Sequence, residues 1–383
     1  MLRYLAILFI FLLYLFPCYQ THFAPLPARW ENLAVTSQAE GQSGDNERPF
    51  FSANFVNQES PGIINHAPSM TVLSNNRIMC AWYAGSREGA KDVAIYYAVF
   101  NDQKDHWTEP SLLMDREQSS KELNRYIKKL GNALIFSDNE GSIWFFYSSL
   151  PFGGWSLSTL NYKVSIDYGK TWNKSKKLIL SPFFNLTNNV KNKGINLSDN
   201  SFILPVYHEF IKKLSQLVLF QPKDTGFYYE IRKMTNERKA IQPTILHQGE
   251  KKLVAFFRNM IRPGKRCILM AKSDDLGQTW SRTTETCLPN PNSGFDMVKL
   301  TKGEYLGVVN DSFDDRSVLV LVMSRDEGNT WKTLKILEKN AGKEYSYPFI
   351  IKERQFYHVA YTFERRRIKH IAFNEAWINQ LSN

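Results

Sequence analysis

Short runs of apolar residues recur along the chain from about residue 62 to residue 376. Polar stretches with glycine, asparagine or aspartate separate them, and no amphipathic helical pattern interrupts them. Because the runs are rich in β-branched and aromatic residues, they predict short β-strands joined by turns, as in a sandwich, a barrel or a propeller. Examples are RIMCAWYA, VAIYYAVF, GSIWFFYS, SFILPVYH, LVLFQ, KLVAFFR, YLGVVN, SVLVLVMS and FYHVAYTF.

An internal repeat decides among these folds. Three octapeptides share the pattern S-x-D-x-G-x-T-W: SIDYGKTW (165–172), SDDLGQTW (273–280) and SRDEGNTW (324–331). The pattern predicts a hairpin turn in which Asp accepts from backbone donors two residues on, Gly adopts a positive φ and Trp anchors the turn. The octapeptides start 108 and 51 residues apart, so a unit of about fifty residues, the size of a four-stranded propeller blade, fits both gaps. We therefore predict an all-β, six-bladed propeller in which these turns are structural.

The N-terminal segment has a different character. In MLRYLAILFIFLLYLFPCYQ, Arg3 precedes a stretch of uncharged, mostly apolar residues, which has the length of a signal-peptide core and is short for a membrane span. We predict a signal peptide or anchor over residues 1–20, an irregular lead-in over 21–60 and the propeller over 61–383. The protein is then exported and is periplasmic, membrane-anchored or secreted.

Charge and cysteine content narrow the partners. The net charge of +11 favours an anionic partner such as an acidic sugar, a glycolipid or a membrane surface, although generic surface lysines explain it equally well. No basic and aromatic module points to nucleic acid. No cluster of histidine or cysteine has metal-site spacing, so we expect no metal and no organic cofactor. Cys267 and Cys287 are able to form one disulfide in an oxidising compartment, but spacing alone leaves this open.

Two opposite charges interrupt a pair of apolar runs in GSREGAKDVAIYY, residues 85–97. Arg87 and Asp92 stand five positions apart there. They are either a surface salt bridge or part of a site on the loop that joins two strands.

From about residue 62 to residue 373 the chain resembles the sialidase (neuraminidase) superfamily, in particular a bacterial branch of predicted neuraminidases. The octapeptides resemble its Asp-box (BNR) repeats, and HAPSMTVL, IQPTILHQGEKKLVAFFR and EYSYPFIIKERQFYHVAYTFERRRIKH resemble segments of its blades. The resemblance implies a propeller with the active site at one end of the central channel. It also implies an exo-glycosidase that releases a terminal 2-keto acid sugar with retention.

The resemblance assigns roles to particular residues. Asp92 matches the general acid/base. Arg258 and Arg316 match two of the three arginines that bind the substrate carboxylate, for which a planar guanidinium is suited. Tyr345 matches the nucleophile, a tyrosine being less repelled by the substrate carboxylate than a second carboxylate. Tyr347 is its rival, because residues two apart on a regular strand share a face.

Two family residues have no counterpart at the matching positions. His66 lies near the place of the first arginine, so either protonated His66 or Arg87 would take over its role in binding the carboxylate.

The glutamate that activates the tyrosine is replaced by Ala240. Gln242 lies close to it and is expected to bind substrate, since an amide cannot act as a base. Glu209 is then the first candidate for this carboxylate and Asp296 the second. Glu344 is expected to point away from the strand face of Tyr345.

These departures leave alternatives open. One alternative is that the substrate is a sialic acid. A second is 3-deoxy-manno-octulosonic acid (Kdo) of lipopolysaccharide, with a possible membrane-associated partner. A third is another uronic or deoxy sugar. A non-catalytic glycan-binding subunit is a further hypothesis. The basic run FERRRIKH, residues 363–370, either binds an anionic surface or is a solvated strand.

Overall fold

The computed structural model describes residues 30, 33–36, 48–101, 106–180, 185, 187–209, 213–223, 226–235, 237–238, 240–261 and 264–382. The predicted signal peptide or anchor lies outside these residues. Within them, no helix is both long and apolar enough to span a membrane.

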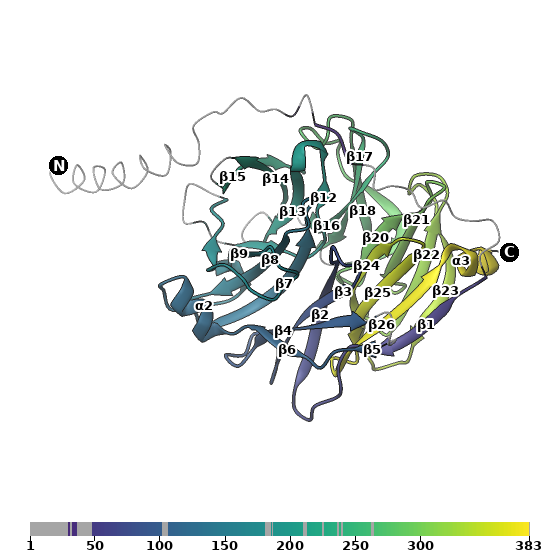
Figure 1. The fold of residues 1–383 in the computed structure, drawn as a ribbon. Coiled ribbons are helices and arrows are strands. Elements are labelled where there is room, and N and C mark those ends of the chain that lie inside the picture. Colours follow the sequence, from purple (N-terminus) through teal and green to yellow (C-terminus); the bar gives the residue numbers. More distant parts are fainter. Residues whose placement is uncertain are drawn as a thin grey trace.

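Six antiparallel sheets follow one another around the molecule and confirm the six-bladed propeller (Figure 1). Each blade begins with its innermost strand. Blade 1 holds β2 (Ile64–Val72), β3 (Ile78–Gly85), β4 (Ala94–Asn101), β5 (His106–Trp107) and β6 (Ser111–Met114). Blade 2 holds β7 (Lys129–Ser137), β8 (Ile143–Leu150), β9 (Thr159–Ser165) and β10 (Lys176–Lys177). Blade 3 holds β11 (Asn188–Val190), β12 (Ile195–Asn196), β13 (Phe202–His208), β14 (Ser215–Lys223) and β15 (Gly226–Lys233).

The second half of the ring repeats this order. Blade 4 holds β16 (Ala240–His247), β17 (Leu253–Asn259), β18 (Cys267–Ser273) and β19 (Thr284–Pro289). Blade 5 holds β20 (Asp296–Lys299), β21 (Tyr305–Asn310), β22 (Val318–Ser324) and β23 (Lys332–Lys339). Blade 6 holds β24 (Tyr345–Glu353), β25 (Phe356–Phe363), β26 (Arg367–Asn374) and β1 (Phe51–Phe55). The short helices are α2 (Arg116–Glu122), α3 (Glu375–Ser382), η3 (Trp155–Leu157) and η4 (Ser198–Asn200).

The last blade is completed by a strand from the other end of the chain. β1 pairs antiparallel with β26, from Phe51 opposite Phe373 to Phe55 opposite Lys369, and Figure 1 shows the purple strand beside the yellow one. Residues 51–55 fall in the segment expected to be an irregular lead-in, yet they form the outer edge of blade 6. The ring is thus closed by hydrogen bonds between distant parts of the sequence.

The core lies between neighbouring blades. Aromatic rings fill the space between blades 2 and 3, where Trp144 lies edge-on to Phe202 at 5.1 Å and Phe202 stacks on Phe220 at 4.6 Å between ring centroids. All three side chains are buried. Close packing of this kind fixes the angle between blades and therefore the positions of the innermost strands that line the central axis.

The three octapeptides form turns with one shared set of hydrogen bonds. In the second, Asp275 accepts from the hydroxyl of Ser273 (2.8 Å) and from the backbone N–H and hydroxyl of Thr279 (2.8 and 2.6 Å). Gly277 has φ +90°, and Trp280 donates to its carbonyl at 3.0 Å. The aspartate therefore reaches a backbone donor four residues on rather than two, and the turns are structural, as predicted.

The substitution Asp275→Ala is expected to lower the free energy of unfolding by about 1–2 kcal/mol, because it removes charge-assisted hydrogen bonds that close the turn. Asp274→Ala is the matched control, since Asp274 is the exposed neighbour. Urea denaturation of the two variants measures the difference. Equal stabilities would show that the carboxylate of Asp275 contributes nothing to the turn.

A buried histidine pair lies at the junction of blades 6 and 1. His358 Nδ1 and His370 Nε2 are 3.0 Å apart, and the rings are parallel within 6°. His370 also packs on Trp107 of blade 1, 5.0 Å between ring centroids. Burial lowers the pKa of His358 to about 4, and burial followed by the charge of His358 lowers that of His370 well below its usual value.

Acidification from pH 6.5 toward pH 4 is therefore expected to destabilise the protein. In this window the unfolded state binds protons that the folded pair cannot, so stability falls as pH falls. For His358 alone the loss is about 3 kcal/mol at pH 4. Urea denaturation at pH 7 and 4.5 tests this on the wild type and on His358→Gln/His370→Gln. The variant should lose part of the pH dependence and not all of it. The pKa of buried His66 is also lowered, so His66 also makes the folded protein less stable as the pH falls. An unchanged pH dependence would contradict the assignment.

Candidate active site

Four innermost strands carry the same irregularity close to their first residues. The pairing register shifts in β2, β7, β16 and β24, and one residue in each shift has a positive φ: Ala67, Asn132, Gln242 and Tyr347. A positive φ in residues other than glycine is uncommon and marks strain that the surrounding fold must hold. The bulges change the side-chain alternation along these strands and turn polar groups toward one end of the channel.

Two of these polar groups, Asn132 and Gln242, are connected through Tyr207. The amide of Asn132 donates to the Tyr207 hydroxyl at 2.8 Å, and the amide of Gln242 donates to it at 3.1 Å. The Gln242 oxygen in turn accepts from Arg258 at 3.0 Å. Side chains from blades 2, 3 and 4 thus share one hydrogen-bond network.

Arg258 is at the centre of this network. Its side chain extends from the end of β17, and the residue is 8% exposed. Nη1 donates to the Tyr347 hydroxyl at 2.8 Å, and Nε donates to Asn292 Oδ1 at 2.9 Å. Burial by itself lowers the pKa of Arg258, but the nearby hydroxyls of Tyr347 and Tyr207 outweigh it, so the pKa is raised. This guanidinium stays charged and faces the phenol oxygen.

Two further arginines converge on one carboxylate. Arg316 Nη1 donates to Glu344 at 3.0 Å, and Arg365 Nε donates to its other oxygen at 2.7 Å. Burial would raise the pKa of Glu344, but the hydrogen bond from Arg365 and the surrounding positive charge hold it at about 2. Arg316 also donates to the carbonyl of Asn292 at 3.0 Å, which joins this group to Arg258.

Arg365 comes from the basic run FERRRIKH and was not among the site residues inferred from sequence. It lies in the three-residue turn, residues 364–366, between β25 and β26, where Glu364 has φ +53° and Arg365 φ +57°. Two successive positive φ angles favour asparagine and glycine. A glutamate and an arginine in this conformation indicate that the turn is maintained for the position of its side chains.

His66 lies beside Tyr347, 4.7 Å between ring centroids, and its Nδ1 is 3.0 Å from the hydroxyl of Thr362. Burial, and then the positive charge of Arg365, lower the pKa of His66 well below its usual value. The imidazole is therefore neutral near pH 7. A neutral imidazole does not support the expectation that protonated His66 takes the place of the first arginine, whereas Arg365 adds a third guanidinium to the group around Glu344.

The structure separates the two candidate tyrosines. Tyr345 is buried in the core of blades 5 and 6 with its ring 5.2 Å from Phe363, and its hydroxyl is 3.5 Å from Glu364. Tyr347 contacts His66 and Arg258 in the site. The inference that both share a strand face is wrong, because Tyr347 itself lies in the bulge of β24, which follows Ser346.

The loop between β3 and β4 carries the predicted acid. Asp92 is exposed and accepts from the backbone N–H and hydroxyl of Ser86, at 2.9 and 3.0 Å. These bonds, the backbone one most strongly, lower its pKa. Neighbouring Arg87 is exposed as well. Glu88, which sequence reasoning missed, reaches the site through an ion pair with Arg365 at 3.1 Å.

The two carboxylates proposed to replace the missing glutamate have different surroundings. Glu209 follows β13, and burial raises its pKa against the opposing charge of Arg258. Asp296 is fully buried and accepts from Lys193, Thr244 and the backbone of Ile350. Glu209 therefore has the environment of a proton acceptor, and Asp296 is committed to structural hydrogen bonds.

The remaining sequence inferences concern metals and disulfides. Within the described ranges, no three side chains of histidine, cysteine, aspartate or glutamate gather as metal ligands. Cys267 and Cys287 are free thiols on the neighbouring strands β18 and β19.

Comparison with known proteins identifies the family of the chain and relates its fold to solved structures. A family model described as BNR repeat-like domain matches residues 76–359. No curated protein matches the chain. Among solved structures, the chain superposes on the Hadza microbial sialidase Hz136 with a TM-score of 0.67, 14% identity and coverage of 81% of this chain and 65% of that one.

Two other sialidase structures give a similar result. Trypanosoma rangeli sialidase has a TM-score of 0.67 at 13% identity, with 88% of this chain and 61% of that chain covered. The intramolecular trans-sialidase from Ruminococcus gnavus has a TM-score of 0.63 at 13% identity, with 82% and 95% covered. This chain thus spans less than two thirds of the first two enzymes. At these identities the likeness shows a shared fold.

Proposed function

The chain belongs to the family of BNR repeat-like domains, and from this premise we propose that it is an exo-glycosidase of the sialidase type that releases a terminal 2-keto acid sugar with retention of configuration. The observation that carries the proposal is the pair of guanidinium groups at Tyr347, from Arg258 and Arg316. Arg258 donates to the Tyr347 hydroxyl at 2.8 Å, and the guanidinium of Arg316 lies 5.3 Å from the centre of the Tyr347 ring. A third guanidinium, that of Arg365, is joined to Arg316 through the carboxylate of Glu344.

The three guanidinium groups suit a substrate with a carboxylate on its anomeric carbon. Planar guanidinium groups bind carboxylates through paired hydrogen bonds. A carboxylate held here would bring its anomeric carbon toward Tyr347. A neutral phenol can approach that carbon where a second carboxylate would be repelled, and Arg258 would stabilise the phenolate as it forms.

In the proposed mechanism Tyr347 replaces Tyr345 as the nucleophile. The Tyr347 oxygen attacks the anomeric carbon and loses its proton to Glu209, while Asp92 protonates the departing glycosidic oxygen. Asp92 then takes a proton from water, the water oxygen bonds to the anomeric carbon, and Tyr347 leaves and regains its proton from Glu209. Every proton is returned at the end of the cycle.

The acid is assigned to Asp92 rather than Glu88 because of their present contacts. Glu88 is held by Arg365, whereas Asp92 is bound only by Ser86 within the described part of the chain. Substrate over the loop would remove water from Asp92, which raises the pKa of a carboxyl and suits proton donation.

The experiment is release of free 2-keto acid sugar by the full chain, followed by mass spectrometry. A sialylated oligosaccharide and a Kdo-containing lipopolysaccharide core are offered separately. Release of either sugar supports the proposal and names the substrate class. Asp92→Asn and Glu88→Gln are run in parallel, and the acid assignment requires that Asp92→Asn lose turnover while Glu88→Gln retains more of it.

Absence of release from both substrates would reject the hydrolase for these sugars. Binding of the free sugars without release would then favour a glycan-binding subunit.

We further propose that the protein acts after export, on the basis of the apolar N-terminal segment. Detection of the epitope-tagged chain in a cytoplasmic fraction alone would reject that part.

A further inference from the structure

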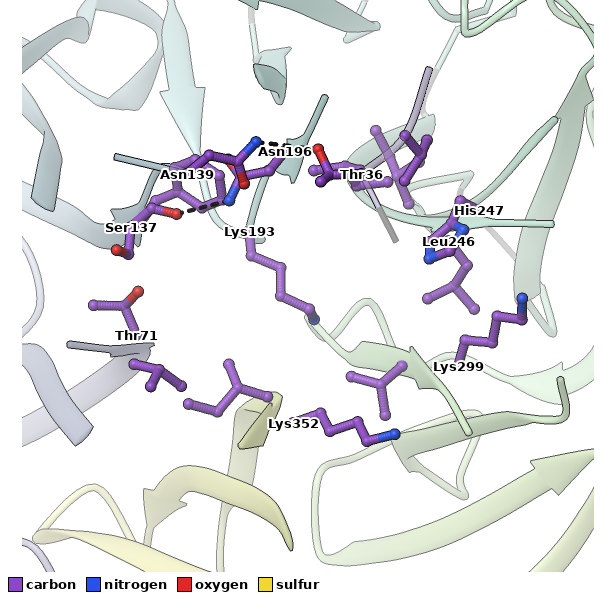
Figure 2. Close-up of a pocket in the computed structure, with 18 of the residues that line it drawn as sticks. Thr36, Thr71, Ser137, Asn139, Lys193, Asn196, Leu246, His247, Lys299 and Lys352 are labelled. Atoms are coloured by element: carbon purple, nitrogen blue, oxygen red, sulfur yellow. Dashed lines mark hydrogen bonds between the residues drawn. The ribbon is translucent and has the colours of Figure 1, made fainter. Parts of the chain in front are cut away.

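A cavity of about 500 Å³ opens at the other end of the central channel from the arginine cluster. The site residues lie near the first residues of the innermost strands, and the cavity is lined by their last residues, including Val72, Phe136 and Ile351. Figure 2 shows the labelled side chains arranged around an open centre, with Lys193 extending toward it. The volume is in the range of small-molecule sites.

Positive charge dominates the lining. Lys193, Lys299, Lys352 and Arg354 contribute cations, and Asp138 is the acidic lining residue. The Asp138 carboxylate is already engaged by the indole N–H of Trp144 at 2.8 Å and by backbone N–H groups. Lys352 donates to a neutral hydroxyl, that of Thr301, at 2.9 Å. The lining therefore carries more ammonium and guanidinium groups than carboxylates.

The same imbalance continues beneath the cavity. Lys193 donates to Asp296 at 2.7 Å, and Asp296 is fully buried. Lys191 is also buried and donates to the carbonyl of Pro348 at 2.6 Å. It lies close enough to interact electrostatically with both Asp296 and Lys193. Two lysine side chains thus lie near the Asp296 carboxylate, and Lys193 is the one that is bonded to it. Burial lowers the pKa of Lys191 to about 7, against the charge of Asp296 and together with that of Lys193.

We propose that this cavity is a second ligand site, distinct from the arginine cluster, and that it binds a small organic anion such as a phosphate monoester through Lys193, Lys299 and Lys352. The anion supplies the negative charge that the floor lacks. The apolar part of the ligand packs on the ends of the innermost strands, among them Met70, Val72 and Ile245. This inference does not depend on the proposed glycosidase activity.

Calorimetric titration of the full chain with phenyl phosphate tests the site, with phenol as the uncharged comparison. The wild type is expected to bind phenyl phosphate at least about tenfold more tightly than Lys299→Met/Lys352→Met, since each substitution removes a charged contact to the phosphate. Lys176→Met, on the outer strand of blade 2, is the matched lysine control and should bind as the wild type does. Lys193→Met is a second test, with its folding checked by circular dichroism.

Arg316→Met separates this site from the arginine cluster. The proposal requires that this variant bind phenyl phosphate within about twofold of the wild type. Loss of binding in Arg316→Met with retention in the lysine variant would overturn it, as would equal binding of phenol or no binding at all.

Proton uptake is an independent readout. A bound anion is expected to keep Lys191 charged near pH 7, so titrations in two buffers of different ionisation enthalpy should show proton uptake in the wild type and less in Lys191→Met. Equal uptake in both would contradict the coupling between the cavity and the buried lysines.

Discussion

Tyr347→Phe is expected to reduce turnover of the 2-keto acid glycoside by about a thousandfold or more, because removal of a nucleophile removes the covalent route altogether. The ring remains, so its contacts with His66 and the nearby guanidinium groups are preserved. Binding of the free sugar should therefore change little, and the loss should fall on kcat rather than on KM.

Tyr345→Phe is the matched control. Its ring is buried against Phe363 and its hydroxyl makes one long contact, 3.5 Å to Glu364. We expect its kcat to stay within about threefold of the wild type. Steady-state kinetics of the two variants decide between them. Loss of turnover in Tyr345→Phe with activity retained in Tyr347→Phe would return the nucleophile role to Tyr345.

Arg365→Met is expected to lower kcat/KM by about a hundredfold, mostly through KM. Loss of a buried charged partner costs about 2–5 kcal/mol in binding, and we expect the low end of this range because the Arg365 side chain is 30% exposed. The substitution also leaves Glu344 and Glu88 without the guanidinium that pairs with both. Their charge would then repel the substrate carboxylate.

The adjacent Arg366→Met is the control, because Arg366 points to Glu59 in an exposed ion pair of 3.2 Å. Exposed pairs of this kind contribute about 1 kcal/mol or less. Its kinetic constants should match the wild type. If both variants behave alike, the third cation is not Arg365, and exposed Arg87 becomes the candidate to test.

The fold was predictable because its signals are local. Apolar runs specify strands, and the octapeptide with Gly277 and Trp280 specifies a turn whose hydrogen bonds lie within eight residues. The strand β1 could not be found in this way. Its residues, FSANF, are partly exposed and carry no strong strand pattern. They form a strand only by pairing with β26, more than three hundred residues away.

The site was partly predictable for a related reason. The resemblance to sialidases pointed to Arg258 and Arg316, and the structure brings both to Tyr347. The resemblance favoured Tyr345, and regular alternation placed Tyr347 on the same strand face. The positive φ of Tyr347 interrupts that alternation and separates the two side chains. Arg365 was missed because it lies in the turn between β25 and β26, where neither Glu364 nor Arg365 is a residue typical of a turn with positive φ.

The pairing of β1 with β26 in blade 6 affects how the chain folds. Residues 51–55 emerge early during synthesis, but their partner, residues 367–374, emerges late. Until then the first blade has no neighbour on one side, and β1 has no partner strand and is open to association with other chains. Contacts of such sequence separation slow folding. The native ring should therefore form slowly after release of the complete chain, and unfolding should begin where β1 leaves β26.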